Sequence, residues 1–492
     1  MLETILPEQM KLLEETYMST YAIPSILLME QAAQGIVDAI SRHADQKACV
    51  VFLCGPGANG GDGYAAARIW QIRGGTSRIF ELSDRASGDA AVNRTLALQH
   101  GCTLVSDLSL LFQGASVIVD ALFGTGLSRP LEGDAAQVID AANQSTLPII
   151  AVDIPSGLSG KTGEILGVAS HCIETVTFHR PKTGLFLRHG PRICGKLTVH
   201  PILIPASYGS IPGLQVIQSR DLPALIAPRP ADAHKGTYGR TLIFAGSRGL
   251  AGAAAMCARA AIRAGSGLTT LLCVSDILPI LQVLVPQATC LPLPNNTEEA
   301  CAMTSQALTR AVRAVIGCGL STDEALLPLL SVFRSASCPV IWDADALTLL
   351  SRHPDLLPLK SNDIITPHPG EAARLLAVST SEVVGDPMQA LSELRRRTGA
   401  SVLLKGARTL MGTESGQAVN LNGTPALAKG GSGDLLAGIL AALLGRVSGE
   451  DSTLTAMQCA CYIHAQAAQT ACKEVGEDCV TAEDILSSIR LR

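Results

Sequence analysis

The stretch ACVVFLCGPGANGGDG, residues 48–63, joins a short apolar run to a glycine-rich turn and leads into the helical pattern YAAARIWQIRG. An apolar run of this length before such a turn is typical of a buried parallel strand that feeds a helix. The same pattern returns in SVIVDALFGTGLSRP, residues 116–130, and in LPIIAVDIPSG, residues 147–157. These strand–turn–helix units predict an α/β fold with a parallel sheet.

A second series of such runs follows a proline-punctuated stretch between residues 201 and 230. Its members are GRTLIFAGS (239–247), GLTTLLCVS (267–275), RAVIGCGLS (313–321), PVIWDAD (339–345), DIITPHPGE (363–371) and ASVLLKGART (400–409). Because prolines interrupt both helix and strand periodicity, the stretch between the two series is interpreted as a linker. We therefore predict two three-layer α/β domains, over residues 1–215 and 216–492.

Composition excludes several classes of protein. The 492 residues carry a net charge of −5 and only 3% aromatic residues, which argues against nucleic-acid binding. The 15 cysteines form no CxxC pair, which disfavours a zinc ribbon or a thioredoxin-type site. The start, MLETILPEQMKLLEETY, lacks the apolar core of a signal peptide, and residues 277–297 contain too many prolines for a membrane helix. We expect a cytoplasmic protein without a membrane partner.

Three loops of the first block combine glycine with oxygen-bearing side chains, and they are Gly55–Gly63, Asp120–Pro130 and Asp153–Gly157. In an open parallel sheet such loops gather at the carboxyl ends of the strands, where ligands bind. The first loop also opens a helix, whose free N–H groups suit an anion such as a pyrophosphate. A single loop of this kind is more often structural, so the functional interpretation rests on all three together.

The motifs NGGDG, VDALFGTGLSRP and VDIPSG occur in that order and resemble the epimerase half of the bifunctional NAD(P)HX epimerase/dehydratase family. That family repairs nicotinamide cofactors hydrated at ring carbon 6, and the resemblance covers roughly residues 1–210 and implies a Rossmann-like domain. The substrate-binding residues it implies are Ala58, Asn59, Gly60, Gly61, Asp62, Gly124, Thr125, Gly126, Leu127, Ser128, Arg129, Pro130 and Asp153. It also implies a potassium ion held by Asn59, Asp120 and Ser156, whose oxygen ligands suit a hard cation.

Ala58 departs from the family pattern, which usually has two asparagines before GGDG. The departure weakens a side-chain contact at this position and leaves the backbone available. It also motivates one alternative, in which the first block is a binding module without catalysis. The chemistry favours catalysis, because a carboxylate such as Asp153 could act as acid and then base while the C6 oxygen leaves and returns.

The second block contains NGTPALAKGGSGD, residues 422–434, which runs into an apolar helix. GGSGD at a helix start forms a backbone site for phosphate oxygens, and Asp434 is placed to take a proton from an acceptor hydroxyl. The GxGD pattern resembles the ribokinase-like superfamily. A plain glycine turn with a capping aspartate is the structural alternative.

Further motifs, HKGTYGR, AGS, IGCGLS, WDADAL, TPHPGE and LKGART, follow the order of the dehydratase half of the same family over about residues 220–490. The resemblance implies Ala253, Gly319, His368 and Asp434 for the hydrated cofactor. It implies Lys405, Gly406, Ala407, Arg408, Thr409 and Gly433 for the adenine nucleotide. Cys318 stands where the family commonly has proline. His464 is interpreted as a packed core residue.

The resemblance implies transfer of phosphate from ADP, with Mg²⁺, to the C6 hydroxyl, after which elimination restores the ring. Motifs alone do not separate ADP from ATP or NADHX from NADPHX. A vitamin-precursor kinase is the runner-up for the second block. The expected partners are small molecules, NADHX, NADPHX and ADP, and long apolar helices with weak charge are compatible with a homo-oligomer.

Overall fold

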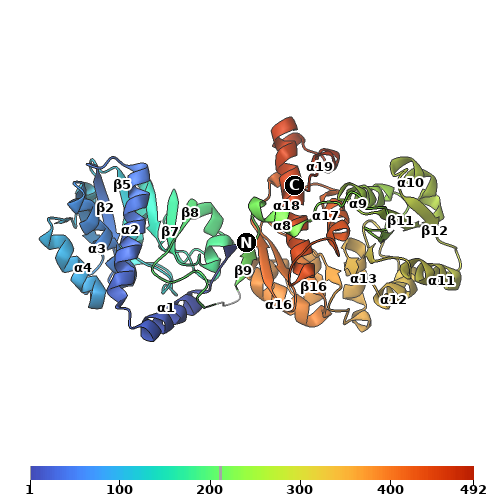
Figure 1. Ribbon diagram of the computed structural model, residues 1–492, viewed down its shortest axis with the longest axis horizontal. Helices are drawn as coiled ribbons and strands as arrows, with labels where there is room; N and C mark the ends of the chain where they lie inside the picture. The colour runs from blue at the N-terminus through green and yellow to red at the C-terminus, as the bar shows by residue number, and fades with distance from the viewer. Residues whose placement is uncertain (1, 210–212, 492) are drawn as a thin grey trace. The chain divides into compact units, whose positions relative to one another are not determined.

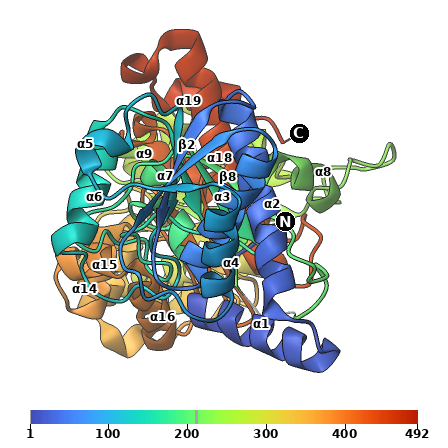
Figure 2. The same ribbon diagram turned by 90° about the vertical axis from the view of Figure 1, so that its left-hand side faces the viewer.

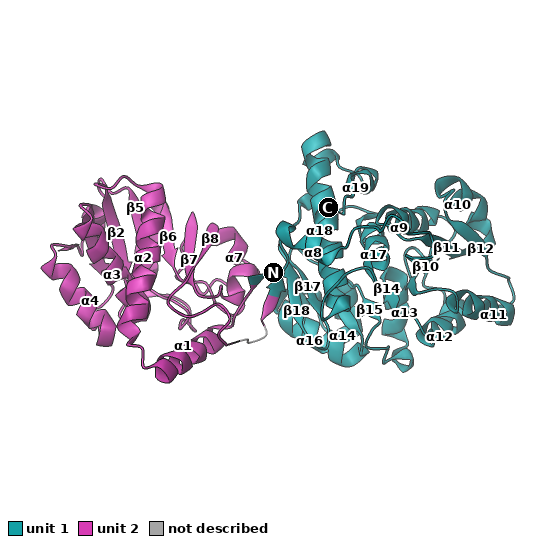
Figure 3. Cartoon of the chain, viewed as in Figure 1, with its two compact units in different colours: residues 1–2, 215–492 teal, residues 3–214 magenta. Residues whose placement is uncertain are grey.

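The computed structural model describes residues 2–209 and 213–491. The chain divides into two compact units, Glu3–Leu214 and the part from Gln215 onward together with Leu2 (Figure 3). The proline-punctuated stretch contains the strand β9 (Leu214–Val216) and the short helix α8 (Leu222–Leu225), so it is not an unstructured linker throughout.

The unit Glu3–Leu214 is built around a parallel sheet. Its strand order is β4 (Thr103–Leu104), β3 (Thr76–Glu81), β2 (Cys49–Cys54), β5 (Val117–Ala121), β6 (Ile149–Val152), β7 (Glu174–Phe178) and β8 (Lys196–His200). From β2 the chain first moves outward to β3 and β4, and then returns to the other side of β2 with β5. Loops from adjacent strands diverge at such a reversal, and a ligand crevice forms there.

Helices cover both faces of this sheet (Figure 2). One apolar cluster is shared by α1 (Pro7–Tyr21), α2 (Ser25–His43) and α3 (Ala58–Ile72), with α4 (Gly88–Gln99) packed against α3. The other face is covered by α5 (Leu108–Leu111) and α6 (Gly133–Gln144). The buried residues of α2 include Ala33, Ile36, Val37 and Ile40, a spacing that places them on one helical face.

Among the described residues, the other sheet is 11-stranded. Its order is β1 (Leu2–Glu3), β9, β18 (Gln417–Asn420), β17 (Thr409–Gly412), β16 (Ser401–Leu404), β15 (Ile364–Ile365), β14 (Val340–Trp342), β13 (Arg313–Ile316), β10 (Arg240–Phe244), β11 (Leu268–Cys273) and β12 (Thr289–Pro292). The strands from β16 to β12 pair in parallel, whereas β17 and β18 are antiparallel.

The helices of this unit also form two layers (Figure 1). One layer contains α9 (Ala251–Arg263), α10 (Leu278–Leu284), α17 (Ser432–Leu443), α18 (Ser452–Val475) and α19 (Ala482–Ser488). The other contains α11 (Thr297–Leu308), α12 (Leu327–Arg334), α13 (Ala344–Arg352), α14 (Pro369–Leu376), α15 (Thr380–Gly385) and α16 (Pro387–Thr398). Every residue from Leu435 to Leu443 of α17 is buried, as expected for a helix that is apolar on all sides.

The predicted fold class, two α/β domains with parallel sheets, is confirmed. All 15 cysteines are free thiols, and Cys479 is the exposed one, whereas the others are buried or half-buried. Within the described ranges, no helix combines the length and the apolar character needed to cross a bilayer.

Candidate active sites

The three glycine-containing loops of the first unit follow β2, β5 and β6, which are neighbours in the sheet. The first two loops touch, because a Cβ atom at Gly124 would lie only 3.0 Å from the side-chain oxygen of Asn59. Gly60 packs so tightly that a Cβ atom there would lie 1.8 Å from the carbonyl oxygen of Gly55. Glycine at these positions therefore allows the close packing of these loops.

Asp120 and Ser156, which follow or end neighbouring strands, are buried and are hydrogen-bonded to each other. The N–H of Ser156 donates to Asp120 Oδ2 at 2.8 Å, and its hydroxyl donates to Asp120 Oδ1 at 2.6 Å. Burial raises the pKa of Asp120, while the hydrogen bonds from Ser156 lower it. The side-chain nitrogen of Asn59 is buried and has no hydrogen-bond partner among the described residues.

This arrangement fits a potassium ion. A fully buried carboxylate needs a compensating positive charge, and Asp120 has neutral hydrogen-bond partners, Ser156 and the Leu122 N–H. The oxygens of Asn59, Asp120 and Ser156 are the type of ligand that a hard cation prefers. The carbonyl oxygen of Phe123, 3.2 Å from the Ser156 hydroxyl, adds one more oxygen to the same place.

Asp153 follows β6 in a left-handed backbone conformation, with φ of +64°. Its carboxylate accepts hydrogen bonds from the Thr177 hydroxyl at 2.9 Å and the Phe178 N–H at 3.4 Å, and it forms an ion pair with Lys182. Lys182 is 1% exposed, so the pair is shielded from water. A strained backbone and a buried ion pair at a strand end together indicate a functional carboxylate.

Two further carboxyl groups share this environment, and they are Asp62 at the start of α3 and Glu14 on α1. Burial, followed by the negative charge of Asp153, raises the pKa of Asp62 well above its usual range. Burial raises the pKa of Glu14 to about 7, although Lys182 opposes the shift. Asp62 was predicted to bind substrate, whereas the sequence interpretation missed Lys182 and Glu14.

The remaining predicted residues of this half belong to the loops after β2 and β5. The loop from Gly124 to Pro130 is half-buried at its start, and Ser128, Arg129 and Pro130 are exposed. Ala58 begins α3 and is exposed.

The second unit contains a cavity of about 600 Å³ at the carboxyl ends of its strands. The predicted nucleotide residues Lys405, Gly406, Ala407, Arg408, Thr409 and Gly433 all line it, together with His368. A volume of this size falls in the range of small-molecule sites. The structure therefore brings together the segment after β16 and the start of α17, which lie far apart in the sequence.

Two features hold the glycine segment at the start of α17 in place: the backbone conformation of Gly431 and the hydrogen bonds that Lys429 donates. Gly431, with φ of +89°, adopts a conformation that favours glycine, and α17 begins immediately afterwards. Lys429 donates to the carbonyl oxygens of Asp478 and Val480, each at 2.6 Å. Ser432 and Gly433 at the start of α17 line the cavity, and a helix N-terminus suits phosphate oxygens.

His464 is buried, as expected for a core residue, but it also lines the cavity. Its Nε2 lies 3.3 Å from the hydroxyl of Ser432 in the glycine segment. Burial, together with the positive charge of Lys405, lowers the pKa of His464 to about 4, so its ring is neutral at neutral pH. The sequence analysis thus predicted the burial of His464 but not its place in the lining of the cavity.

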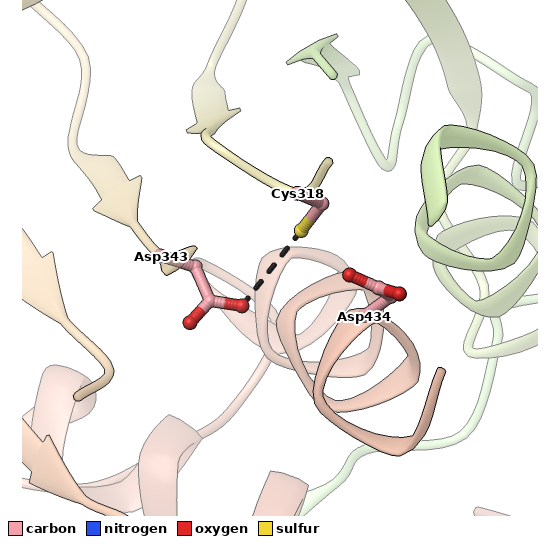
Figure 4. Close-up of side chains that lie close together, drawn as sticks. All are labelled: Cys318, Asp343 and Asp434. Atoms are coloured by element: carbon pink, nitrogen blue, oxygen red, sulfur yellow. Dashed lines mark hydrogen bonds between the residues drawn. The ribbon is translucent and has the colours of Figure 1, made fainter. Parts of the chain in front are cut away.

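Asp434 lies beside Asp343 and Cys318, and one ligand atom from each falls within 4.8 Å of the others (Figure 4). The Cys318 thiol is 3.7 Å from Asp343 Oδ2, and Lys405 Nζ is 2.9 Å from Asp343 Oδ1. Burial, followed by the charge of Asp343, raises the pKa of Asp434 to about 7. The two carboxylates suit Mg²⁺, whereas a thiol does not.

The other predicted substrate residues are Ala253 on α9, Gly319 after β13 and His368 before α14. A Cβ atom at Gly319 would lie 2.8 Å from the Cβ of Ala253, so these two residues are adjacent. His368 caps α14, where its Nδ1 accepts the Gly370 N–H at 3.0 Å. Within the described residues, the lining of the 600 Å³ cavity includes His368 but not Ala253, Gly319 or Asp434.

Comparison with known proteins supports the family resemblance of both halves of the chain. A family model described as NAD(P)H-hydrate dehydratase matches residues 241–491, and one described as YjeF-related protein N-terminus matches residues 25–184. The bifunctional NAD(P)H-hydrate repair enzyme Nnr of Thermofilum pendens is 34% identical, and the match covers 97% of this chain and 94% of that protein. This chain belongs to the bifunctional NAD(P)H-hydrate repair enzyme family.

Other members of the family and a solved structure extend the comparison. The bifunctional NAD(P)H-hydrate repair enzyme Nnr of Escherichia coli is 34% identical, with 89% of this chain and 84% of that protein covered. A ribokinase-like superfamily protein from Enterococcus faecalis is 26% identical over 56% of this chain and 94% of its own, with a TM-score of 0.50. The ribokinase-like fold of the second half is thereby confirmed, as is the family resemblance.

Proposed function

We propose that this chain repairs hydrated nicotinamide cofactors in two steps. The unit Glu3–Leu214 interconverts the R and S forms of NADHX and NADPHX, and the unit from Gln215 onward dehydrates the S form while ADP is converted to AMP and phosphate. The observation that carries this proposal is the pair of sites, each after parallel strands and each with a half-buried aspartate, Asp153 or Asp434.

For epimerisation, the ring nitrogen of the substrate provides the electron pair that expels the C6 oxygen. Asp153 acts as acid and base in this proposal, because Thr177 and Lys182 hold its carboxylate in a fixed orientation at the end of β6. The loops 58–62 and 124–130 bind the dinucleotide. Asn59, Asp120 and Ser156 would hold K⁺, which supplies the positive charge that the buried Asp120 needs.

For dehydration, Asp434 takes the proton of the C6 hydroxyl as the phosphoryl group of ADP is transferred to the oxygen. Its pKa of about 7 suits a general base at neutral pH. Lys405–Thr409 and Gly433 bind the nucleotide in the 600 Å³ cavity. Ala253, Gly319 and His368 bind the hydrated cofactor. Asp343 and Asp434 would hold Mg²⁺, which would supply positive charge for the transferred phosphoryl group.

The second site works because phosphate leaves carbon more readily than hydroxide does. Once the phosphate ester has formed, the ring nitrogen expels phosphate and the dihydronicotinamide ring is restored. The epimerase complements this reaction, since a dehydratase specific for one epimer leaves the other behind. We extend the proposal to a cytoplasmic enzyme with small-molecule partners, no nucleic acid or membrane among them, and a homo-oligomeric state.

The test supplies both epimers of hydrated NADH with ADP and Mg²⁺ and follows the return of the dihydronicotinamide absorbance. Complete, rapid recovery is expected. Recovery that stops at the share of one epimer would remove the epimerase activity from the proposal. No recovery, with phosphoryl transfer to another acceptor, would point instead to a kinase. A reaction without enzyme measures spontaneous epimerisation.

A second experiment tests the potassium site. Epimerisation is measured in K⁺, in Na⁺ and in a large organic cation, for the native chain and for Asp120→Asn. We expect the native rate to depend on K⁺ and the variant to lose that dependence, while dehydration of the S epimer is unaffected in both. Equal epimerisation rates in all three cations would contradict the assignment.

A further inference from the structure

A hydrogen bond links the wall of the 600 Å³ cavity to the glycine segment at the start of α17. Nε2 of His464, on α18, lies 3.3 Å from the hydroxyl oxygen of Ser432, the residue between Gly431 and Gly433. Both residues line the cavity, and each is only 6% exposed. The family resemblance and the comparisons assign no role to either side chain.

Helix α18 contributes one polar side chain to the lining of the cavity. Its residues there are Cys461, His464 and Ala465, which are spaced by three and four positions and so lie on one face of the helix. A buried imidazole loses hydration, and a hydrogen bond has to offset that loss. Within the described residues, the partner of the His464 ring is the Ser432 hydroxyl.

Ser432 lies next to the residues that we propose for nucleotide binding. A Cβ atom at its neighbour Gly433 would lie 3.6 Å from Nζ of Lys405. The Ser432 N–H donates to the carbonyl oxygen of Lys429 at 3.3 Å, which holds the backbone of the segment. The Ser432 hydroxyl therefore belongs to a part of the cavity where an ammonium group and a helix N-terminus favour an anion.

The charges of the lining also favour an anionic ligand. The lining contains Lys405 and Arg408, and none of the described residues in it is an aspartate or a glutamate. A cationic imidazole is disfavoured here, since burial and the charge of Lys405 lower the pKa of His464 to about 4. The ring is therefore neutral at neutral pH, and a neutral imidazole has one N–H donor and one acceptor nitrogen.

A neutral imidazole beside a hydroxyl group allows two arrangements. In the first, the Ser432 hydroxyl donates to Nε2 of His464, and only the lone pairs of the serine oxygen are left for a ligand. In the second, the Nε2–H donates to the serine oxygen, and the hydroxyl proton is left for another acceptor. Lone pairs repel a phosphate oxygen, whereas a hydroxyl proton binds it. An anionic ligand therefore selects the second arrangement.

We propose that His464 is a positioning residue of the nucleotide site, whose Nε2–H holds the Ser432 oxygen so that the Ser432 hydroxyl donates to a phosphate oxygen of ADP. The inference rests on the proposed function of the second unit and deepens it, because it adds a side-chain donor to the backbone N–H groups of the glycine segment. A hydrogen bond to a charged acceptor is stronger than one between neutral groups. No covalent bond changes in this step.

The experiment measures the dissociation constant of ADP with Mg²⁺ by calorimetric titration of the full chain. His464→Phe keeps an aromatic ring and removes the N–H, so we expect the affinity for ADP to fall about tenfold, near the lower end for a lost hydrogen bond to a charged group. Ser432→Ala should lose at least as much. His464→Gln keeps an N–H donor at the ε position and should recover most of the affinity. Tyr462→Phe, on α18 but outside the cavity lining, should match the native chain.

A double-mutant cycle separates this role from a general effect on the fold. If His464 acts through Ser432, the variant with both His464→Phe and Ser432→Ala should bind ADP about as well as Ser432→Ala alone. Losses that multiply in the double variant would overturn the inference. Native affinity for ADP in Ser432→Ala would also overturn it, and this measurement decides the matter even where His464→Phe fails to fold.

Dehydration of S-NADHX on the same preparations distinguishes this inference from the proposed function. His464→Phe should raise KM for ADP and leave kcat within about threefold of the native value, as expected for a lost binding contact. If the native chain dehydrates S-NADHX and His464→Phe binds ADP with native affinity, the inference alone fails. If the variants weaken ADP binding as expected but the native chain does not dehydrate S-NADHX, the proposed function alone fails. A native chain that does not bind ADP would overturn both.

Discussion

The two half-buried aspartates that we assign to catalysis, Asp153 and Asp434, have different electrostatic partners. Asp153 is paired directly with a buried lysine, Lys182. In the other unit Lys405 pairs with Asp343, and Asp434 remains beside these groups with a pKa raised by burial to about 7. The buried lysine of one unit therefore pairs with the catalytic aspartate itself, whereas the lysine of the other unit pairs with its neighbour Asp343.

The largest effect is expected from Asp434→Asn, which removes the proton acceptor of the second site. Dehydration of S-NADHX should fall about 10³-fold in kcat, within the range for a general base, while R-to-S conversion stays at its native rate. The return of dihydronicotinamide absorbance and a chiral separation measure the two activities. Dehydration at the native rate in this variant would contradict the role of Asp434 as the proton acceptor, and Asp434 would then be a helix-capping residue only.

The Lys182→Met variant tests the ion pair between Lys182 and Asp153 in the first unit. The variant leaves Asp153 buried without its cation, so we expect about a 10²-fold loss of epimerisation and a destabilisation of this unit by about 3 kcal/mol, as for a broken buried ion pair. Denaturant titration with hydrogen exchange of residues 3–209 reports the stability. Dehydratase activity at a temperature well below unfolding serves as the internal control. A stable variant with native epimerisation would show that the ion pair is dispensable.

Dehydration by the second unit should depend on pH. Burial raises the pKa of Asp434 to about 7, and a base must be ionised, so dehydration should weaken about tenfold per pH unit below 7. Dehydration rates measured on one preparation between pH 5.5 and 8.5 check this. A rate that does not change over this range would contradict the role of Asp434 as the base.

Cys318→Ser should have the smallest effect, within about threefold in dehydration kcat. The thiol is a weak donor to Asp343, which already accepts from Lys405 at 2.9 Å and from the Thr366 hydroxyl at 2.8 Å. Initial rates with saturating ADP measure the change. A loss above tenfold would mean that Cys318 contributes to the orientation of Asp343 more than the geometry indicates.

Most of the fold could be predicted from local sequence. The apolar runs before glycine-rich turns became β2, β5, β6 and the central strands of the second sheet, because strand length and turn composition are local properties. The three loops of the first site could also be predicted, since neighbouring parallel strands bring their carboxyl ends together.

The missed residues depend on contacts between distant segments. Nothing in the letters HRPKTG shows that Lys182 is buried beside Asp153, 29 residues earlier. Glu14 left a weak signal, its spacing from Met10 and Tyr17 on an amphipathic helix, which indicates a half-buried face. His464 lies in a mostly apolar stretch of the sequence, and its contact partner Ser432 lies 32 residues earlier in the chain. Long-range proximity of this kind is set by packing, which short motifs do not encode.

The unequal exposure of the cysteines offers a way to observe the second site in solution. Cys479 is the exposed thiol, and its neighbours Asp478 and Val480 accept hydrogen bonds from Lys429, one residue before Gly430 of the glycine segment. A fluorophore attached by brief maleimide treatment should therefore label Cys479 first. Its emission would report rearrangement of the phosphate-binding loop on nucleotide binding, without any engineered cysteine.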